Sequence, residues 1–329
     1  MIMVISRRRA LAGVSCTLAL HQVSSVSIVP AFAESAAGTD AAVSKLEARA
    51  RQAGVALQSQ DTAGPSEQSG TFRRSKARLL DVISAVDGAG QSEDIALEAD
   101  QLLQDMHAHE RMNGQGFVED PLQGAAAIPD FADIKDEYRS LFDACVVRDD
   151  RTSDVNSDLR ILTLPQNRPR YEAVSQKTAT PWYFIAIVHD LEVSFRFRGH
   201  LHNGDPLARR TVQVPKNRPP VWQPPSDWES SAEDAITYEQ TIKKKVWGRP
   251  DDWSLERMLY RFEIYNGFGT RAHGINTPYL WSFSTHYVKG KYIYDGRWDP
   301  DAVSDQCGAA VLLFELVKAG TIERPPASM

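Results

Sequence analysis

Two carboxylates and a threonine lie within a twenty-residue stretch near the middle of the chain, and they are the first candidates for chemistry. Glu192 closely follows the apolar run WYFIAIVHDL, Asp205 comes thirteen residues later, and Thr211 six after that. Cleavage of a glycosidic bond needs a protonated carboxyl group that donates to the leaving oxygen and, in inverting enzymes, a carboxylate that activates water. The spacing predicts Glu192 as the acid, Asp205 as the base and Thr211 as a holder of the water.

Two local elements are predicted to position these groups. The apolar run from Pro181 to Leu191 predicts a buried helix, which at eleven residues is too short to cross a membrane. Glu192 would emerge from its apolar face, and such surroundings favour the protonated form of a carboxyl group; an exposed Glu at a helix end is the alternative. The Asn-Gly pair inside His200–Asp205 predicts a solvated hairpin that keeps Asp205 ionised.

A second set of polar and aromatic side chains is predicted to line a sugar cleft. These residues lie downstream in ERMLYRFEIYNGFGTR and PYLWSFSTHY, with one more in the hairpin. Aromatic rings can stack on sugars, although plain packing in the core is the common alternative for such residues. The candidates for substrate binding are Glu263, Tyr265, Asn266, Tyr279, Trp281 and His202.

The order of these motifs resembles the catalytic core of the lysozyme superfamily. A helix that delivers a Glu, followed by a hairpin that delivers an Asp and a Thr, is similar to goose-type and phage lysozymes and to bacterial lytic transglycosylases. Tyr265-Asn266-Gly267 resembles the Tyr-Asn motif of those enzymes. Over residues 130–320, the combined pattern IVHDLE, HLHNGDPL, YNGFGTR, GINTPYLWSFSTHY, GKY and QCGAA resembles a bacterial lysozyme-like family of peptidoglycan hydrolases.

This resemblance implies a muramidase without a cofactor. Its substrate would be the glycan strands of peptidoglycan, cut at the β-1,4 linkage between N-acetylmuramic acid and N-acetylglucosamine, with Glu192 as general acid. Lytic transglycosylases use one Glu as acid and then as base and form a 1,6-anhydro sugar. A silent Asp205 would therefore indicate the transglycosylase route.

Two further functions remain open at the level of sequence. His200 and His202 alternate as on a strand, and with Asp205 or His189 they could form the zinc site of a peptidoglycan amidase or endopeptidase, although no helical His-Glu-x-x-His motif is present. The chain could also be a wall-binding protein without catalysis. We predict no metal for the glycosidase itself.

The first thirty-three residues predict an export signal. Arg7, Arg8 and Arg9 precede an apolar stretch, and Ala31-Phe32-Ala33 provides a cleavage pattern, so we expect a periplasmic or secreted protein routed by a twin-arginine-like or Sec signal. Cleavage would change the net charge from −6 to about −9. An acidic chain without a basic stripe disfavours nucleic-acid binding, and no transmembrane segment is expected in the mature chain.

The remaining sequence predicts an α+β, mainly α, architecture in two parts. Every Trp and Tyr lies between Tyr138 and Trp298, which places the lysozyme-like domain at residues 130–320, with a tail at 321–329. Residues 34–129 predict a loosely packed helical extension that can be removed without unfolding the domain. Cys145 and Cys307 are equally consistent with one disulfide and with two buried thiols. The expected helices span residues 41–57, 72–86, 93–112, 130–147, 167–177, 182–191, 229–244, 253–265 and 309–318.

Overall fold

The structure is a computed structural model that describes residues 36–57, 75, 76, 78–83, 85, 86, 93–112, 118, 119, 128–212, 215–222, 227–294 and 297–328. The described residues are mainly helical with one small antiparallel sheet, which confirms the α+β, mainly α, class. The predicted export signal at residues 1–33 lies outside the described residues. Among the described residues, no helix is both long and apolar enough to cross a membrane.

The helices follow the sequence signals closely. Asp130 caps the first domain helix by accepting from the Ala132 N–H (2.9 Å), and Asp227 caps another by accepting from the Ser230 N–H (2.6 Å), as expected of N-cap carboxylates. The helices are α1 (Ala36–Gln52), α3 (Glu93–Met112), α4 (Phe131–Asp143), α5 (Thr152–Leu162), α6 (Arg168–Thr178), α7 (Trp182–Val193), α8 (Trp228–Ile242), α9 (Lys244–Trp247), α10 (Leu255–Asn266), α11 (Pro278–Trp281) and α12 (Ala309–Lys318), with 3-10 turns at Asp149–Arg151 and Gly269–His273.

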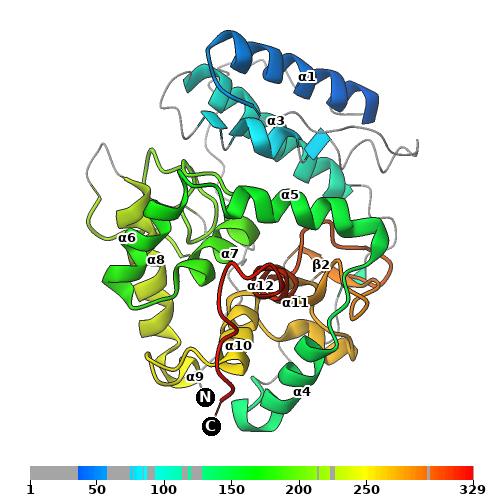
Figure 1. Cartoon of the computed structure of the whole chain (residues 1–329), viewed down its shortest axis with the longest axis vertical. Helices are drawn as coiled ribbons and strands as arrows, with labels where there is room; N and C mark the ends of the chain where they lie inside the picture. The colour runs from blue at the N-terminus through cyan, green and yellow to red at the C-terminus, as the bar shows by residue number, and fades with distance from the viewer. Residues whose placement is uncertain are drawn as a thin grey trace, which may run out of the picture.

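We call the described residues from 128 to 328 the larger body. Helix α7 lies in its core, and α5, α6, α10 and α12 pack around it (Figure 1). Its residues from Phe184 to Val188 are completely buried, because this helix is apolar around its whole circumference. Phe184 stacks on Phe262 of α10 with 4.4 Å between ring centroids. The scaffold of the predicted acid is therefore fixed by packing on all sides.

The sheet does not form where the sequence predicts a hairpin. Strands β1 (Val118–Glu119), β2 (Lys291–Tyr294) and β3 (Arg297–Asp299) pair antiparallel in the order β1-β3-β2, with Tyr292 and Val118 both opposite Trp298. Residues 199–206 instead form a compact turn with one isolated bridge. The antiparallel pairing there is limited to this bridge between Gly199 and Pro206, with the His200 N–H donating to the Asp205 carbonyl (2.8 Å) and the Leu207 N–H to the Arg198 carbonyl (2.7 Å), and no longer ladder forms.

The N-terminal helices are well packed, and their buried side chains belong to the same hydrophobic cluster as those of the rest of the described chain. Val43 and Leu46 of α1 and Leu103 of α3 are at most 1% exposed, and so are Leu79 and Ile83 of a segment that we call the Lys76 segment. The Lys76 segment comprises the helical residues 75, 76, 78–83, 85 and 86. This packing corrects the expectation of a loosely packed extension. Aliphatic side chains from three helices combine into one core, which a search for aromatic residues cannot detect.

Several contacts join residues 34–129 to the larger body, beyond which α1 and α3 lie at one end of the molecule (Figure 1). Strand β1 belongs to the sheet of the larger body. Arg198 forms an ion pair with Asp100 of α3 (3.1 Å), and Arg160 forms one with Asp81 of the Lys76 segment. These contacts argue against removing residues 34–129 without a loss of stability.

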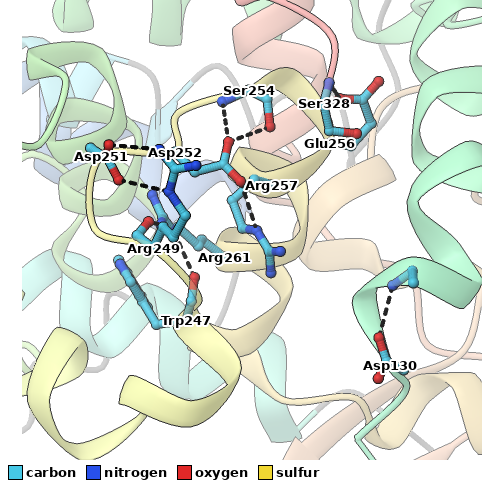
Figure 2. A network of polar contacts seen from close by, with 11 residues as sticks. Asp130, Trp247, Arg249, Asp251, Asp252, Ser254, Glu256, Arg257, Arg261 and Ser328 are labelled. Atoms are coloured by element: carbon cyan, nitrogen blue, oxygen red, sulfur yellow. Dashed lines mark hydrogen bonds and ion pairs between the residues drawn. The ribbon is translucent and has the colours of Figure 1, made fainter.

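The start of α10 and the predicted C-terminal tail are held together by polar contacts (Figure 2). The Asp252 carboxylate accepts from the Ser254 N–H (3.2 Å) and hydroxyl (2.7 Å). The Glu256 carboxylate accepts from the N–H of Ser328 (2.6 Å), and the Leu255 N–H donates to the backbone of residue 326. The tail therefore contributes to fixing the helix that carries Glu263.

Cys145 and Cys307 are separate buried thiols and not a disulfide. Burial raises the pKa of Cys145 to about 12 and raises that of Cys307 well above its ordinary value. Both thiols therefore stay protonated and unreactive at neutral pH.

Candidate active site

Glu192 occupies the last turn of α7, where a fully buried helix reaches the surface. Its side chain is partly exposed, whereas Leu191 and Val193 on either side are buried. The backbone carbonyl of Leu191 accepts a hydrogen bond from Gln306 Nε2 (3.2 Å), which fixes this end of the helix from the α12 side. The carboxylate thus stands on a rigid, mostly apolar support.

The turn that follows Glu192 has an unusual backbone. Ser194 (φ 51°) and Phe195 (φ 59°) are consecutive non-glycine residues in the left-handed region. Such residues cost on the order of 1–2 kcal/mol each, and the structure compensates by burying Phe195 completely and by hydrogen bonds from both N–H groups to the carbonyls of Asp190 and His189. This turn redirects the chain so that residues 199–206 pack on the end of α7.

Tyr279 is the side chain that directly contacts the Glu192 carboxylate. Its hydroxyl donates to Glu192 Oε1 at 2.9 Å. Tyr279 lies on α11, which Thr277 caps by accepting from the Tyr279 N–H (3.3 Å), and Trp281 at the end of α11 is buried. Among the predicted site residues, the structure therefore brings Glu192 and Tyr279 together, although 87 residues separate them in sequence.

Asp205 lies near α7, but its carboxylate holds its own loop. Oδ2 accepts from the Val212 N–H (2.8 Å) and from Asn203 Nδ2 (3.1 Å), and Asp205 is 4% exposed. The predicted solvated setting is therefore wrong. Gly204 (φ +77°) brings the turn so close to α7 that a side chain there would meet the Glu192 carbonyl at 3.1 Å.

Thr211 also has a structural contact for each of its polar groups. Its hydroxyl donates to the Pro215 carbonyl and accepts from the Arg218 N–H (2.9 Å), while its own N–H donates to the Arg218 carbonyl (2.9 Å). Thr211 is 1% exposed. A role in holding a catalytic water has no support in this geometry, because the hydroxyl closes the loop between residues 211 and 218.

The two alternating histidines do face the same way, towards α8. His200 pairs through Nδ1 with the Ser231 hydroxyl (2.6 Å) and donates from Nε2 to the Arg209 carbonyl (2.6 Å), and His202 Nε2 lies 2.8 Å from the Asp234 carboxylate. Burial lowers the pKa of His200, which keeps the ring neutral.

The hydrogen bonds of His200 argue against the zinc hypothesis. Both ring nitrogens of His200 are occupied by these hydrogen bonds. The part of the chain that the structure describes contains no group of three or more His, Cys, Asp or Glu side chains arranged to hold a metal ion. His189, the other candidate ligand, is fully buried beside the Tyr171 hydroxyl (3.0 Å), and burial lowers its pKa to about 3.

Glu263 is a buried structural anchor. Its carboxylate accepts two hydrogen bonds from Arg271 (2.8 and 2.9 Å) and a third from the Tyr138 hydroxyl (2.6 Å). Burial raises the pKa of Glu263, and the Arg271 guanidinium opposes that shift. The bidentate pair ties α10 to α4 and to the turn after α10, and it leaves no carboxylate oxygen for a substrate.

The other residues predicted to contact sugar fall into two groups, those that are buried and those that are exposed. Tyr265 is 2% exposed and packs among Phe184 and Trp247, and Trp281 is 1% exposed with its ring edge on His286. These aromatic side chains are core residues and cannot stack on a sugar. Asn266 at the end of α10 is exposed, and Tyr279 is partly exposed. His202, at 1% exposure, is also removed from the set of surface contacts.

Comparisons with protein-family models, curated proteins and solved structures were made for the whole chain. Nothing matches it.

The sequence reasoning missed a carboxylate two residues before Glu192. Asp190 lies on another face of α7, since two residues on a helix are separated by about 200°. It is 6% exposed, and burial raises its pKa to about 7. In the sequence, the signal for Asp190 was an ionisable residue inside an otherwise apolar helix. Asp158 of α5 shares this setting, and burial together with the charge of Asp190 raises its pKa as well.

Proposed function

We propose that the chain cleaves the β-1,4 linkage between N-acetylmuramic acid and N-acetylglucosamine in peptidoglycan, with Glu192 as general acid. The observation that carries the proposal is the partly exposed carboxylate on a completely packed helix, oriented by the hydroxyl of Tyr279. The strained turn at Ser194 and Phe195 supports it, because strained backbone concentrates at functional sites. The motif resemblance to lysozyme-like enzymes supplies the substrate class.

The hydrogen bond from Tyr279 suits the role of the acid. The hydroxyl holds Oε1 and so fixes the orientation of the carboxyl group. Proton transfer from the protonated carboxyl group to the glycosidic oxygen lets the bond between that oxygen and the sugar carbon break, and Glu192 becomes a carboxylate. The ionised form then accepts a stronger hydrogen bond from the same hydroxyl, so Tyr279 stabilises the state that forms during bond cleavage.

The second step favours a route with one catalytic carboxylate. The Asp205 carboxylate is committed to Val212 and Asn203 and almost completely buried, which makes it a poor base for water. Glu192 itself can take the proton from the attacking hydroxyl group. If that hydroxyl belongs to the sugar, the product is a 1,6-anhydro sugar, as in a lytic transglycosylase; if it belongs to water, the product is a reducing end.

The first test is Glu192→Gln on purified peptidoglycan. The amide keeps the shape and can still accept from Tyr279 but cannot donate an acidic proton, so we expect turnover to fall by roughly two or more orders of magnitude. Glu172→Gln is the matched control, because Glu172 is an exposed carboxylate on α6 whose ion pair with Arg168 lies on the surface. Equal activity of both variants would remove Glu192 from the mechanism.

The second test is Asp205→Asn combined with mass spectrometry of the digest. Asparagine can still accept from the Val212 N–H, so we expect near-normal turnover and 1,6-anhydro ends. A loss comparable to that of Glu192→Gln would instead assign Asp205 as a base. Free peptide stems with intact glycan strands would identify an amidase or peptidase, and bound but uncut strands would identify a wall-binding protein.

Export to the periplasm or beyond is part of the same proposal, since peptidoglycan lies outside the cytoplasm. Mass spectrometry of the exported fraction should find a chain that begins at or near Glu34. A full-length intracellular species as the sole product would contradict it.

A further inference from the structure

A cavity on another face of α7 contains a cluster of charged groups that the proposed glycosidase chemistry does not use. It lies where the Lys76 segment, α5, the end of α7, Phe283 and the loop before α12 meet, and its empty space of about 470 Å³ includes open solvent. Its charged lining consists of Lys76, Asp154, Asp158, Asp190 and Asp305.

Two of the four carboxylates already have cationic partners. Asp305 lies between Lys76 (3.7 Å) and Lys291 (3.6 Å), and Asp154 pairs with Arg151 (3.2 Å). These ion pairs balance the charge of Asp154 and Asp305. Asp158 and Asp190 are the two carboxyl groups of the lining that remain without a cationic partner among the described residues.

Asp190 and Asp158 form no side-chain hydrogen bond or ion pair with any residue that the structure describes. Asp190 is only 6% exposed, and it lines the cavity. Burial raises the pKa of both carboxyl groups, and the charge of Lys76 opposes that shift without a direct contact. Asp158 is partly exposed, whereas Asp190 is buried. A buried carboxyl group without a partner is costly, and in folded proteins such a group commonly marks the place of a ligand.

The chemistry of the cavity specifies what such a ligand must offer. It must bring donors and positive charge to two carboxylates, and the described residues provide no cluster of three or more ligands for a metal ion. A primary ammonium group has three donors in a compact charge and fits both requirements. Leu80 and Phe283 in the same lining provide apolar surface for an alkyl chain attached to it.

We propose that this cavity binds the ammonium group of a primary alkylamine, with Asp158 and Asp190 accepting its hydrogen bonds. The amine can be a free diamine or the side chain of a lysine-like residue in a peptide. The proposal is independent of the glycosidase function, because it concerns another face of α7 and is tested by binding alone.

The test measures binding of 1,5-diaminopentane to the full chain by calorimetry at pH 8 and low salt, beside Nα-acetyl-lysine methylamide as the peptide-borne amine. We expect saturable 1:1 binding that Asp190→Asn weakens by at least tenfold and that the double change Asp158→Asn/Asp190→Asn abolishes. Asp150→Asn, an exposed carboxylate on the 3-10 turn before α5, is the control and should bind as the unchanged chain does. The tighter of the two amines identifies the source.

Three outcomes would overturn the proposal. One is the absence of saturable binding by either amine, and another is binding that Asp190→Asn leaves unchanged. The third is equal binding of 1-pentanol, which would show that the alkyl chain and not the charge is recognised. Binding should also weaken below about pH 6, because protonation of Asp190 and Asp158 removes the negative charge while Lys76, Lys291 and Arg151 stay positive.

Discussion

Replacing Asp190 with asparagine should stabilise the protein at alkaline pH. Burial raises the pKa of Asp190 from 3.8 to about 7, so between these values the folded chain holds a proton that the unfolded chain has released. The stability that this protonation supports is fully present below pH 3.8 and is lost as the pH rises through about 7. Asparagine resembles the protonated carboxyl group in shape and charge, and it does not ionise.

The magnitude follows from the same two values. At about 1.4 kcal/mol per pH unit, a pKa difference of roughly three corresponds to about 4 kcal/mol at pH 8. Because Asp158 interacts with Asp190 and the pair releases its protons jointly, we expect a measured gain of about 2–4 kcal/mol at pH 8, falling towards zero near pH 4.

Urea denaturation of the unchanged chain and of Asp190→Asn at pH 8, 7, 6 and 5, at constant ionic strength, measures this gain. Asp150→Asn serves as the control and should follow the unchanged chain at every pH. A variant that is less stable than the unchanged chain at pH 8 would refute the reasoning. A difference that does not vary with pH would refute it too, since only ionisation produces the pH dependence.

Three further substitutions test the packing around the candidate site. Tyr279→Phe removes the hydrogen bond to Glu192 (2.9 Å) and should lower turnover on peptidoglycan by about 10- to 100-fold without changing the denaturation midpoint. Glu263→Gln breaks the bidentate ion pair between the buried Glu263 carboxylate and the partly exposed Arg271 guanidinium, and we expect a loss of about 2–3 kcal/mol in urea denaturation; an unchanged midpoint would contradict the anchor role. Gly308→Ala would put a methyl group 2.2 Å from a backbone carbonyl of α11, so purified protein should melt well below the unchanged chain, and an equal melting temperature would show that α11 and α12 are less closely packed.

The sequence by itself determined most of the helices and the position of Glu192. Apolar periodicity predicted α3 and α12 at their observed bounds, and Asp130 and Asp227 cap their helices as their residue type predicts. These features depend on interactions within a few residues, which is the range over which a sequence pattern is informative. The apolar run before Glu192 indicated a buried helix for the same reason.

Tertiary structure decided which side chains are available for chemistry. Asp205, His202 and Tyr265 have residue types that suit catalysis or sugar binding, but all three are buried. His202 contacts Asp234 of α8, Tyr265 packs on Phe184, and Asp205 is held by its own loop. Tyr279 could not be assigned to Glu192 without the fold, because 87 residues separate them.

The same holds for the acidic cavity and the small sheet. The cavity assembles from five separated segments, and the sheet joins residues near 118 to residues near 298. Burial and long-range pairing are properties of the packed chain as a whole. Local patterns therefore predict which elements form, while the folded core determines which carboxyl groups remain exposed, which are paired and which are left without a partner.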